Sequence, residues 1–511
     1  MTLNSYLVRG TLVGALGGLL FGFDTAVIAG TTHMLTQFYA LSSGQLGFTV
    51  SSALIGTVIG AMLAGIPGQR IGRRDTLRIL AVAYVVSAIG CALAWNWYAL
   101  LFFRVIGGLG IGGSSVLGPM YIAEIAPAQW RGRLVGTFQI NIVIGVLLAY
   151  MSNFYIETFH LGMQQWRWQL GVAAVPATLF LVMLLTIGRS PRWLVMQARI
   201  EEAREALLCA NTPDLESELQ EIVDSVHLER QAKSEPLLTR KYRLPIFLAV
   251  TIAIFNQLTG INAIIYYMND IFAAAGFNSL SAGKQAVYVG LANLVATLAA
   301  ISAIDKLGRK TLLLIGSVGM AICLLLVAVI FQIPGHQRDL LPLLVLYIVA
   351  FAISQGAVIW VYLAEVFPTR VRAKGQSLGT SANWISNAIL SGIFPVIALH
   401  HAAVPFYFFA AMMVLQFFVV LFIYPETKGL SLEQMQRKMG IYYPFNNRLH
   451  PIQSTARPRA VCTEVQCPHR FSGKSFSMAG VSLRSISPWA CAPATAAAIL
   501  AIAAHNSCYG L

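Results

Sequence analysis

The sequence predicts an all-α membrane protein in which twelve transmembrane helices form two halves of six helices each. Hydrophobic residues make up 57% of the 511 residues and charged residues only 11%, which leaves too little polar surface for a soluble domain. Apolar runs of about 20 residues, the length that crosses a hydrocarbon core of roughly 30 Å, recur along the chain with short polar breaks. Short motifs of the first half also return in the second half. These observations favour a polytopic membrane protein with an internal repeat.

Twelve apolar runs are long enough to cross a membrane. The first run does not look like a cleaved signal, because it carries Asp24 near its middle and lacks a small-residue cleavage site. We predict transmembrane helices at residues 8–30, 47–67, 77–96, 100–122, 134–154, 169–187, 245–268, 286–304, 311–332, 341–364, 377–398 and 404–424.

Basic residues mark one side of the predicted membrane domain. The opposite side carries only Arg167, Lys284 and Arg338. Cytoplasmic loops of membrane proteins are enriched in lysine and arginine, so both termini are predicted to be cytoplasmic. The predicted location is the cell membrane, specifically a bacterial inner membrane, which the chain crosses several times. The net charge of +14 is then explained by orientation and by contact with anionic lipid, and no motif indicates nucleic-acid binding. The basic residues after the even-numbered spans are Arg70, Arg73, Arg74, Arg78, Arg131, Arg133, Arg370, Arg372 and Lys374.

The longest polar stretch inside the chain defines the predicted domains. Residues 189–243 combine glutamates and arginines with leucines and isoleucines at helical spacing, which is typical of short amphipathic helices at a cytoplasmic surface. This helical linker separates an N-terminal six-helix bundle at 1–188 from a C-terminal six-helix bundle at 244–425. Residues 426–511 are predicted to be a cytoplasmic tail, disordered after residue 449.

The end of the chain has a different composition. Cys462, Cys467, Cys491 and Cys508 lie among prolines and serines after residue 449. Cys462 and Cys467 are too isolated to make a metal site. Two interpretations stay open, a flexible tail or a different reading frame fused to a normal end, and we assign the segment no fold.

The two halves repeat each other around the linker. Residues 68–74, after the second span, resemble residues 305–310, after the eighth span. The offset is 241 residues both from Glu124 to Glu365 and from Arg131 to Arg372. Two related halves that rock about a central site are a common construction of secondary transporters.

Asp24 lies deep in the first predicted helix. A carboxylate at this depth is costly, so it is a functional candidate that should face a cavity and have a partner. Arg104, inside the fourth helix and followed by five glycines that permit close helix packing, is the predicted partner. We predict that Asp24 binds a proton from outside and then releases Arg104. The alternative is a static ion pair that fastens the two helices.

The seventh predicted helix carries polar side chains in the middle of the membrane. Asn256, Gln257, Thr259 and Asn262 lie around Gly260, where the helix can unwind. Amides and phenols both donate and accept hydrogen bonds, which suits a neutral polyol. The alternative for each residue is an ordinary hydrogen bond between helices. Further candidates around a central cavity are Tyr266, Asn293, Trp360, Asn383, Trp384 and Gln139.

These residues carry a resemblance to a known family. Residues 17–25, Arg104 with Gly107, Gly108 and Gly110, Glu124 with residues 131–133, residues 257–262 and residues 425–429 resemble the sugar porter family of the major facilitator superfamily, over about residues 5–435. Within it the chain is most similar to bacterial xylose and hexose proton symporters. The resemblance implies proton coupling at Asp24 and Arg104. It implies sugar contacts at Phe21, Gln139, Gln257, Asn262, Tyr266, Asn293, Trp360, Asn383 and Trp384, to which we add Asn256 as a sugar-binding candidate.

Four positions depart from the family pattern. Asn256 and Asn383 each replace a glutamine and are one methylene shorter, which would reshape the pocket, and Ala357 replaces a proline that affects the bend of the tenth helix. Arg189 replaces a glutamate that, in the family, joins cytoplasmic salt bridges of the outward-facing state. We therefore expect Arg189 to bias this chain away from that state, by about 1 kcal/mol.

The resemblance also implies a cytoplasmic salt-bridge network. Opposite charges at helix ends can form a latch that breaks when the cytoplasmic side opens. The alternative is that the basic members only reflect membrane topology. The predicted members are Arg73, Arg74, Glu124, Arg131, Asp305, Arg309, Glu365, Arg372 and Glu426.

The sequence thus predicts a secondary active transporter that brings a monosaccharide, pentose or hexose, into the cytoplasm with protons by alternating access. A proton-independent sugar facilitator is the first alternative, and a sugar sensor of transporter fold is the second. No nucleotide loop, metal cluster or activated nucleophile suggests an enzyme, a cofactor or a bound metal. The expected partners are the monosaccharide, protons and the lipid bilayer, and the chain is expected to be a monomer.

Overall fold

The computed structural model describes residues 4–127, 130–210, 214–231, 235–333, 335–368, 371–428, 434–435 and 438–439. Within these ranges the side chains of residues 228–231 and 301–306 are not described. The predictions for the tail after residue 449, its cysteines included, lie outside the described residues.

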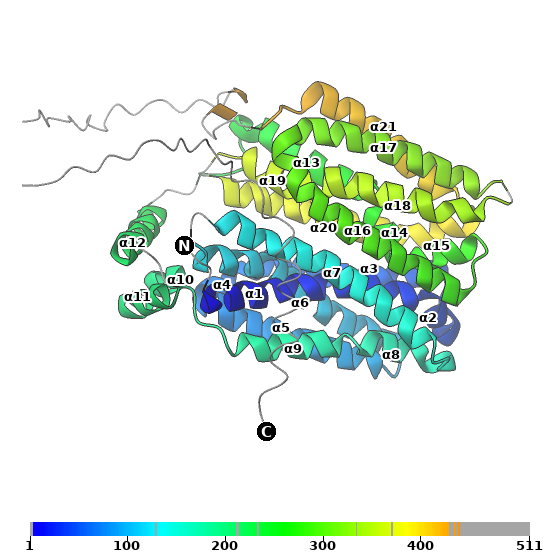
Figure 1. Ribbon diagram of the computed structural model, residues 1–511, viewed down its shortest axis with the longest axis horizontal. Helices are drawn as coiled ribbons and strands as arrows, with labels where there is room; N and C mark the ends of the chain where they lie inside the picture. Colours follow the sequence, from blue (N-terminus) through cyan, green and yellow to red (C-terminus); the bar gives the residue numbers. More distant parts are fainter. Residues whose placement is uncertain are drawn as a thin grey trace, which may run out of the picture. The chain divides into compact units, whose positions relative to one another are not determined.

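The described chain is helical throughout its membrane part (Figure 1). Several helices begin at a polar side chain that satisfies a free backbone N–H group, as helix starts require. Asn4 and Asn96 accept from Leu7 and Ala99, and Ser42 forms a capping box with Gln45. The first half comprises α1 (Ser5–Val27), η1 (Ile28–Gly30), α2 (Thr32–Tyr39), α3 (Ser43–Leu63), α4 (Gly65–Arg70), α5 (Arg73–Ala92), α6 (Trp97–Ile125), α7 (Arg131–Glu157), η2 (Gly162–Gln164), α8 (Gln165–Gly171) and α9 (Ala174–Leu184).

The linker and the second half follow in the same manner. The predicted amphipathic linker helices are present as α10 (Pro191–Met196), α11 (Ile200–Cys209) and α12 (Leu215–Gln231). The second half comprises η3 (Arg240–Tyr242), α13 (Arg243–Leu258), α14 (Ile261–Tyr266), α15 (Met268–Ala274), α16 (Ser279–Leu307), α17 (Arg309–Ile330), η4 (Gln337–Asp339), α18 (Leu340–Phe351), the π-helical turn η5 (Ala352–Gly356), α19 (Ala357–Glu365), α20 (Arg372–His400) and α21 (Val404–Ile423).

Eleven helical segments in the described part of the chain are long and apolar enough to cross a membrane. They correspond to eleven of the twelve predicted spans. The remaining prediction, 286–304, falls within α16, which is 29 residues long. At 1.5 Å per residue this helix is about 43 Å long, enough to cross a bilayer.

Two membrane helices are interrupted near their middle. The seventh breaks at Gly260, as predicted, with φ of +83° between α13 and α14. A Cβ atom at Gly260 would also lie 2.4 Å from the Phe409 ring, so only glycine fits. The tenth contains η5 immediately before Ala357, and such π-helical turns are frequent at functional sites.

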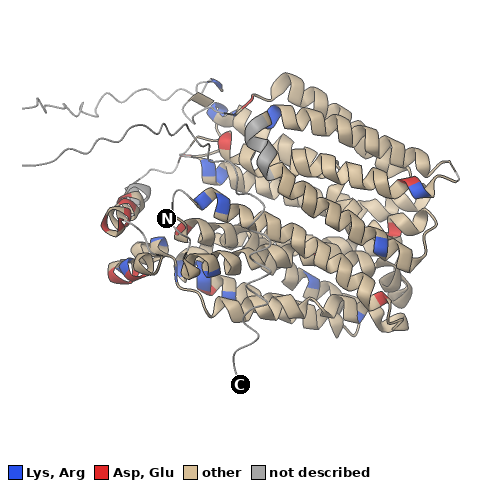
Figure 2. Ribbon diagram, in the orientation of Figure 1, with Lys and Arg blue, Asp and Glu red and all other residues tan. Residues whose placement is uncertain are grey.

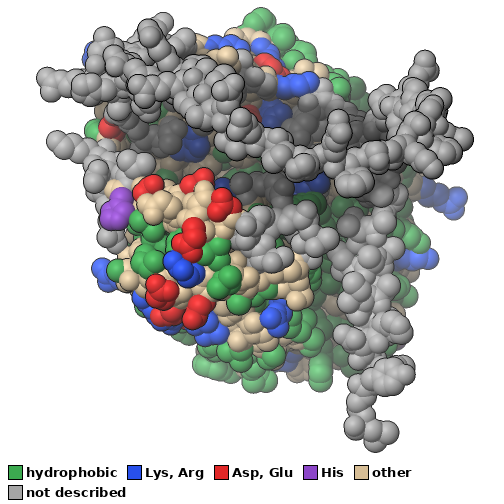
Figure 3. Space-filling view, turned by 60° about the vertical axis from the view of Figure 1, so that its left-hand side comes forward, with side chains coloured by type: hydrophobic (Ala, Val, Ile, Leu, Met, Phe, Trp, Pro, Cys, Tyr) green, Lys and Arg blue, Asp and Glu red, His purple; other side chains and the backbone are tan. Residues whose placement is uncertain are grey.

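Charged side chains concentrate at one end of the helix bundle. The N-terminus and α10 to α12 lie at this end, which we call the linker end, and we call the opposite end, with α2 and α15, the far end (Figure 1). Most lysines, arginines, aspartates and glutamates of the described chain gather at the linker end (Figure 2). Glu201 of α11 and Glu216 of α12 are exposed, and Figure 3 shows acidic side chains gathered on this part of the surface. The middle of the bundle is almost free of charge, as a membrane core requires.

The two halves pack against each other near the far end. Gly47, at the start of α3, approaches α20 so closely that a Cβ atom would lie 1.9 Å from the Gly392 carbonyl oxygen. The Tyr150 hydroxyl of α7 donates to the Ile265 carbonyl oxygen of α14 at 2.9 Å. Gly283 of α16 lies against Phe154 and Glu157 of α7. The far end is therefore closed in this structure.

Candidate functional site

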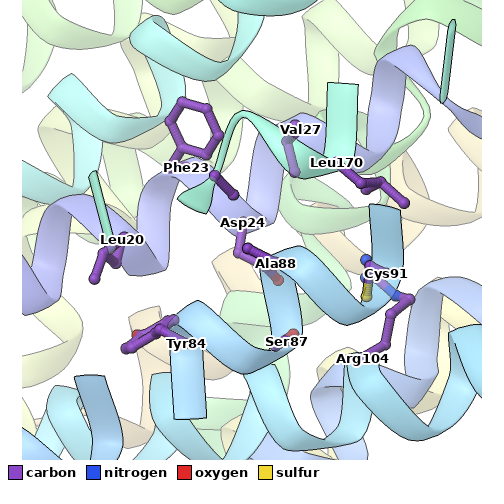
Figure 4. A pocket seen from close by; sticks show the side chains of 11 residues that line it. Leu20, Phe23, Asp24, Val27, Tyr84, Ser87, Ala88, Cys91, Arg104 and Leu170 are labelled. Carbon is purple, nitrogen blue, oxygen red and sulfur yellow. The ribbon is translucent and has the colours of Figure 1, made fainter. Parts of the chain in front are cut away.

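Asp24 and Arg104 line one pocket inside the first half (Figure 4). Asp24 comes from α1 and Arg104 from α6, and α5 contributes Tyr84, Ser87 and Cys91 to the same walls. Apolar side chains complete the lining. The fold thus brings a carboxyl group and a guanidinium group, 80 residues apart in the sequence, to one small and mostly apolar pocket.

The two charged residues share the pocket without forming an ion pair. No hydrogen bond or ion pair joins Asp24 to Arg104 among the described contacts. Arg104 is 4% exposed, and its Nε atom donates to the Thr49 carbonyl oxygen of α3 at 3.0 Å. A buried arginine needs such a partner when no carboxylate neutralises it. This geometry leaves Asp24 free to hold a proton.

Four of the predicted sugar-binding amides form one hydrogen-bonded cluster. Gln257 Nε2 lies 3.2 Å from both Asn256 Oδ1 and Asn383 Oδ1. Asn262 Nδ2 donates to Gln257 Oε1 at 2.8 Å, across the break at Gly260. Asn383 Nδ2 lies 3.2 Å from Asn256 Oδ1. The break in the seventh helix and α20 together gather donors and acceptors suited to hydroxyl groups.

Aromatic side chains connect this cluster to the first half. The Phe21 ring of α1 meets the Trp384 ring of α20 edge to face, with centroids 5.2 Å apart. Trp384 follows Asn383 directly, and its buried Nε1 atom has no hydrogen-bond partner. An unpaired buried donor is costly unless a ligand or water accepts from it. It is therefore a candidate contact for a sugar oxygen.

Tyr266 extends the polar surface toward the far end. Asn387 Nδ2 lies 3.4 Å from the Tyr266 hydroxyl, and the Ser391 hydroxyl donates to Asn387 Oδ1 at 3.0 Å. Asn387 was not among the predicted residues. Its position one turn after Asn383, on the same face of α20, is the signal that could have identified it.

Three predicted sugar-binding residues make no described hydrogen bond with the cluster. Gln139 and Asn293 are half-buried, and Trp360 is 41% exposed. None of the three makes a side-chain hydrogen bond in the described structure. Tyr84, Ser87 and Cys91 were also missed by sequence reasoning, because no charge or motif distinguishes them from ordinary residues of an apolar helix.

The predicted salt-bridge network appears as two separate clusters at the linker end. In the first half Arg73 pairs with Glu124, with Nη2 and Oε1 2.8 Å apart, and the Ser190 hydroxyl donates to Glu124 Oε2 at 2.5 Å. In the second half Arg309 pairs with Glu365 at 3.1 Å, and the Thr427 hydroxyl donates to Glu365 Oε2 at 2.6 Å. Both pairs lie within one half.

The remaining predicted members have different surroundings. Arg74 pairs with Asp75 at 2.9 Å, and Arg372 Nε lies 3.5 Å from the Phe367 carbonyl oxygen. Arg131 is exposed. The side chain of Asp305 lies outside the described ones.

Glu426 accepts hydrogen bonds from four backbone N–H groups, those of Arg309, Lys310, Thr427 and Lys428. Partial burial opposes ionisation, but these four bonds outweigh it and hold the pKa of Glu426 below its ordinary value.

Arg189, which stands where the family pattern has a glutamate, pairs with an acidic residue. Its Nη2 atom lies 3.2 Å from Asp75 Oδ2, and Asp75 is shared with Arg74 and Arg78. Three arginines thus surround one carboxylate at the linker end of the first half. Arg189 also lies over the Trp193 ring, with its Cζ atom 5.2 Å from the ring centroid.

Comparison with known proteins places the chain in a family. The family model described as "Sugar (and other) transporter" matches residues 10–439. The D-xylose-proton symporter of Escherichia coli (strain K12) is 36% identical over 472 residues, covering 85% of this chain and 96% of the symporter. The arabinose-proton symporter of Bacillus subtilis (strain 168) is 34% identical over 439 residues, covering 84% of this chain and 95% of that protein.

Solved structures match the fold over the same region. The xylose transporter of Escherichia coli in a partially occluded inward open conformation matches with a TM-score of 0.76, at 35% identity, over 84% of this chain and 100% of that chain. A proton:xylose symporter of the major facilitator superfamily bound to 6-bromo-6-deoxy-D-glucose matches with a TM-score of 0.70, at 36% identity, over 85% and 99%. On these matches the chain belongs to the sugar transporter family, with the major facilitator fold of a membrane transporter and not of an enzyme.

Proposed function

We propose that this protein is a proton-coupled symporter that carries a pentose or hexose into the cytoplasm by alternating access. The observation that carries the proposal is the pairing of two sites. One is the charged pocket of Asp24 and Arg104, and the other is the neutral amide cluster around Gln257 and Asn383. Amides and an indole suit sugar hydroxyls, and a carboxyl group in an apolar pocket suits a proton.

Helix α1 offers a physical link between the two sites. Phe21 contacts Trp384 beside the amide cluster, and Asp24 lies one turn further along the same helix. A shift of α1 when Asp24 gains or loses a proton would therefore move Phe21 against the sugar site. Proton binding in the first half would thereby change the binding of a sugar that is held mainly by the second half.

The orientation follows from charge. The linker end carries the arginines and lysines that the positive-inside rule assigns to the cytoplasm (Figure 2). The closed far end would then face the outside, as expected of a conformation that opens toward the cytoplasm. The match to a relative in a partially occluded inward open conformation, with a TM-score of 0.76, supports the same assignment.

The energy of one proton is sufficient for the proposed work. A proton that crosses 100 mV supplies about 2.3 kcal/mol, which sustains roughly a fifty-fold gradient of a neutral solute. If Asp24 is protonated from the outside and deprotonated to the inside, each transport cycle carries one proton inward and gains this energy. In this structure Arg104 is bonded to Thr49 instead of Asp24, the arrangement expected after Asp24 has taken up its proton.

Sugar uptake into proteoliposomes tests the proposal. Labelled pentoses and hexoses are offered to the native chain and to Asp24→Asn, with and without an imposed proton gradient. We expect uphill accumulation by the native chain only, and downhill exchange by both. Asp339→Asn, which removes an exposed carboxylate outside the pocket, is the matched control and should accumulate normally.

The other outcomes identify the alternatives. Downhill entry that is indifferent to the gradient and to Asp24→Asn would make the protein a facilitator. Absence of movement of every sugar by a correctly folded protein would contradict transport and favour a sensor.

A further inference from the structure

A buried carboxyl group lies where the two halves meet at the far end. Asp270 belongs to α15 of the second half, and α15 packs against η1 of the first half. The Oδ2 atom of Asp270 is buried and has no hydrogen-bond partner. On the same helix, the side-chain oxygen of Asn269 is also buried without a donor. An ionised carboxylate here would lack the donors and cations that normally compensate its burial.

The surroundings of Asp270 offer little to an anion. The Thr32 hydroxyl, at the start of α2, is the hydrogen-bonding group that favours its ionised form. Burial outweighs this bond and raises the pKa of Asp270 from 3.8 to about 7. No described cation forms an ion pair with it. The described charged or titratable side chains on the neighbouring elements are Lys284 and Tyr288 on α16, Tyr266 on α14, Tyr267 between α14 and α15, and His33 and Tyr39 on α2.

We propose that Asp270 is a second proton-binding site, whose protonation allows the interface between α15 and η1 to close. The inference rests on the alternating-access cycle proposed above. When the far end opens, the carboxyl group meets water and loses its proton readily. When the far end closes, the group must enter the interface in its neutral form. The proton that it holds returns to the same side on reopening, so it adds nothing to the number of protons transported per sugar.

The direction of the pH effect follows from the two states. In the open state Asp270 would have an ordinary carboxyl pKa, near 3.8, and in the closed state its pKa is about 7. Closure is therefore favoured most at low pH. Between these two values the ratio of closed to open molecules falls by up to about tenfold for each pH unit, and above the closed-state pKa it becomes constant. An acidic exterior would thus promote closure of the outer side.

Hydrogen exchange of the intact protein in lipid nanodiscs tests this proposal. The exchange of backbone amides in residues 261–276 is compared between the native chain and Asp270→Asn at matched pH values from 5 to 8. Because the comparison is made at equal pH, the chemical dependence of exchange on pH cancels. We expect the protection of this segment in the native chain to fall, relative to Asp270→Asn, by up to about tenfold per unit as pH rises to 7. Asp339→Asn, whose carboxylate is 62% exposed, is the control and should follow the native profile.

A second variant keeps the carboxyl group and shifts its titration. Thr32→Val removes the hydroxyl that favours the ionised form, so the fall in protection should move to higher pH. Identical pH profiles for the native chain and Asp270→Asn would overturn the proposal. An unshifted profile in Thr32→Val would do the same.

Transport measurements separate this proposal from the general one. Asp270→Asn should still accumulate sugar with an unchanged proton-to-sugar ratio, whereas Asp24→Asn should not accumulate it. A reduced proton-to-sugar ratio in Asp270→Asn would assign the transported proton to Asp270 and contradict its role as a site on the outer interface alone. If only Asp24→Asn lost accumulation, and the exchange profiles of the native chain and Asp270→Asn were equal, the proposed symport would stand. The proposed role of Asp270 would be rejected.

Discussion

The linker ends of the two halves share one arrangement of side chains. After a glycine, α5 begins with Arg73 and α17 with Arg309, and each arginine pairs with a glutamate, Glu124 or Glu365. A hydroxyl group completes each cluster, from Ser190 in the first half and from Thr427 in the second. The internal repeat of the sequence is therefore a repeat of contacts as well.

The position before each hydroxyl residue is where the halves differ. Glu426 precedes Thr427 and accepts from the first two backbone N–H groups of α17. Arg189 precedes Ser190 and cannot accept a hydrogen bond, so it pairs with Asp75 instead. A carboxylate at a helix start satisfies free N–H groups and complements the helix dipole, and a guanidinium does neither. The start of α17 in the second half therefore has a carboxylate cap, which the start of α5 in the first half lacks.

The largest expected effect comes from removing the glutamate of the buried pair. Glu124→Gln leaves Arg73, which is 6% exposed, without a counter-charge and should lower the free energy of unfolding by about 3 kcal/mol. Glu365→Gln in the more exposed pair should cost less, about 1 kcal/mol. Thermal unfolding of the two variants in detergent measures the difference. Equal losses would mean that burial does not distinguish the two clusters.

The cap itself can be tested by making the second half resemble the first. Glu426→Arg removes the acceptor of four backbone N–H groups and puts a cation at the start of α17, which should cost about 2 kcal/mol. Glu426→Gln keeps an acceptor without the charge and should cost about half as much. Unfolding midpoints report both changes. If Glu426→Arg were as stable as the native chain, the Glu426 cap would not contribute to the difference in stability between the two halves.

The reverse change should make the first half resemble the second. Arg189→Glu supplies an acceptor near the start of α5 and should stabilise that end by about 1 kcal/mol, since the site is partly exposed. If Arg189 also disfavours the outward-facing state, the substitution should raise the population of molecules open at the far end about fivefold. Distances between spin labels at the far end measure this population. Arg70→Glu, at an exposed position of the same end, controls for the change of charge alone.

Low pH should destabilise the start of α17 in the second half but not the start of α5 in the first half. The pKa of Glu426 is lowered by backbone hydrogen bonds against its partial burial, so its stabilising contribution is present above the ordinary glutamate pKa of 4.5 and is lost as pH falls through the folded-state value. We expect amide exchange at residues 309–312 to accelerate below about pH 4.5, beyond the change in Glu426→Gln at the same pH. The start of α5 should show no such difference between these two proteins.

Most of the fold could be predicted from the sequence because a bilayer admits few solutions. Twenty-residue apolar runs must be helices in hydrocarbon, and the loop charges indicate which side each end should face. The break at Gly260 was predictable, because glycine in a polar stretch of a membrane helix is a place to unwind. The π-helical turn at 352–356 was not predictable, because it depends on how the tenth helix packs.

The candidate site was only partly visible in the sequence. Asp24, Arg104 and the amides of the seventh helix attract notice because each is costly in lipid unless it has a partner. Asn387, Tyr84 and Asp270 did not, because nothing in the sequence says which neighbour they meet. Tyr84 bonds to Ser114 inside the first half, and Asn387 bonds to Tyr266 across two helices of the second.

The sequence by itself determined the family, the membrane spans, the repeat and the identity of the charged residues at the linker end. Each of these depends on composition or on order along the chain, which folding does not change. Only the tertiary structure decided that Arg104 bonds to Thr49, that Arg189 bonds to Asp75, and that Asp270 is enclosed between the halves. Side-chain partners on different helices are fixed by packing angles and by the conformational state of the transporter, and neither is encoded in local sequence.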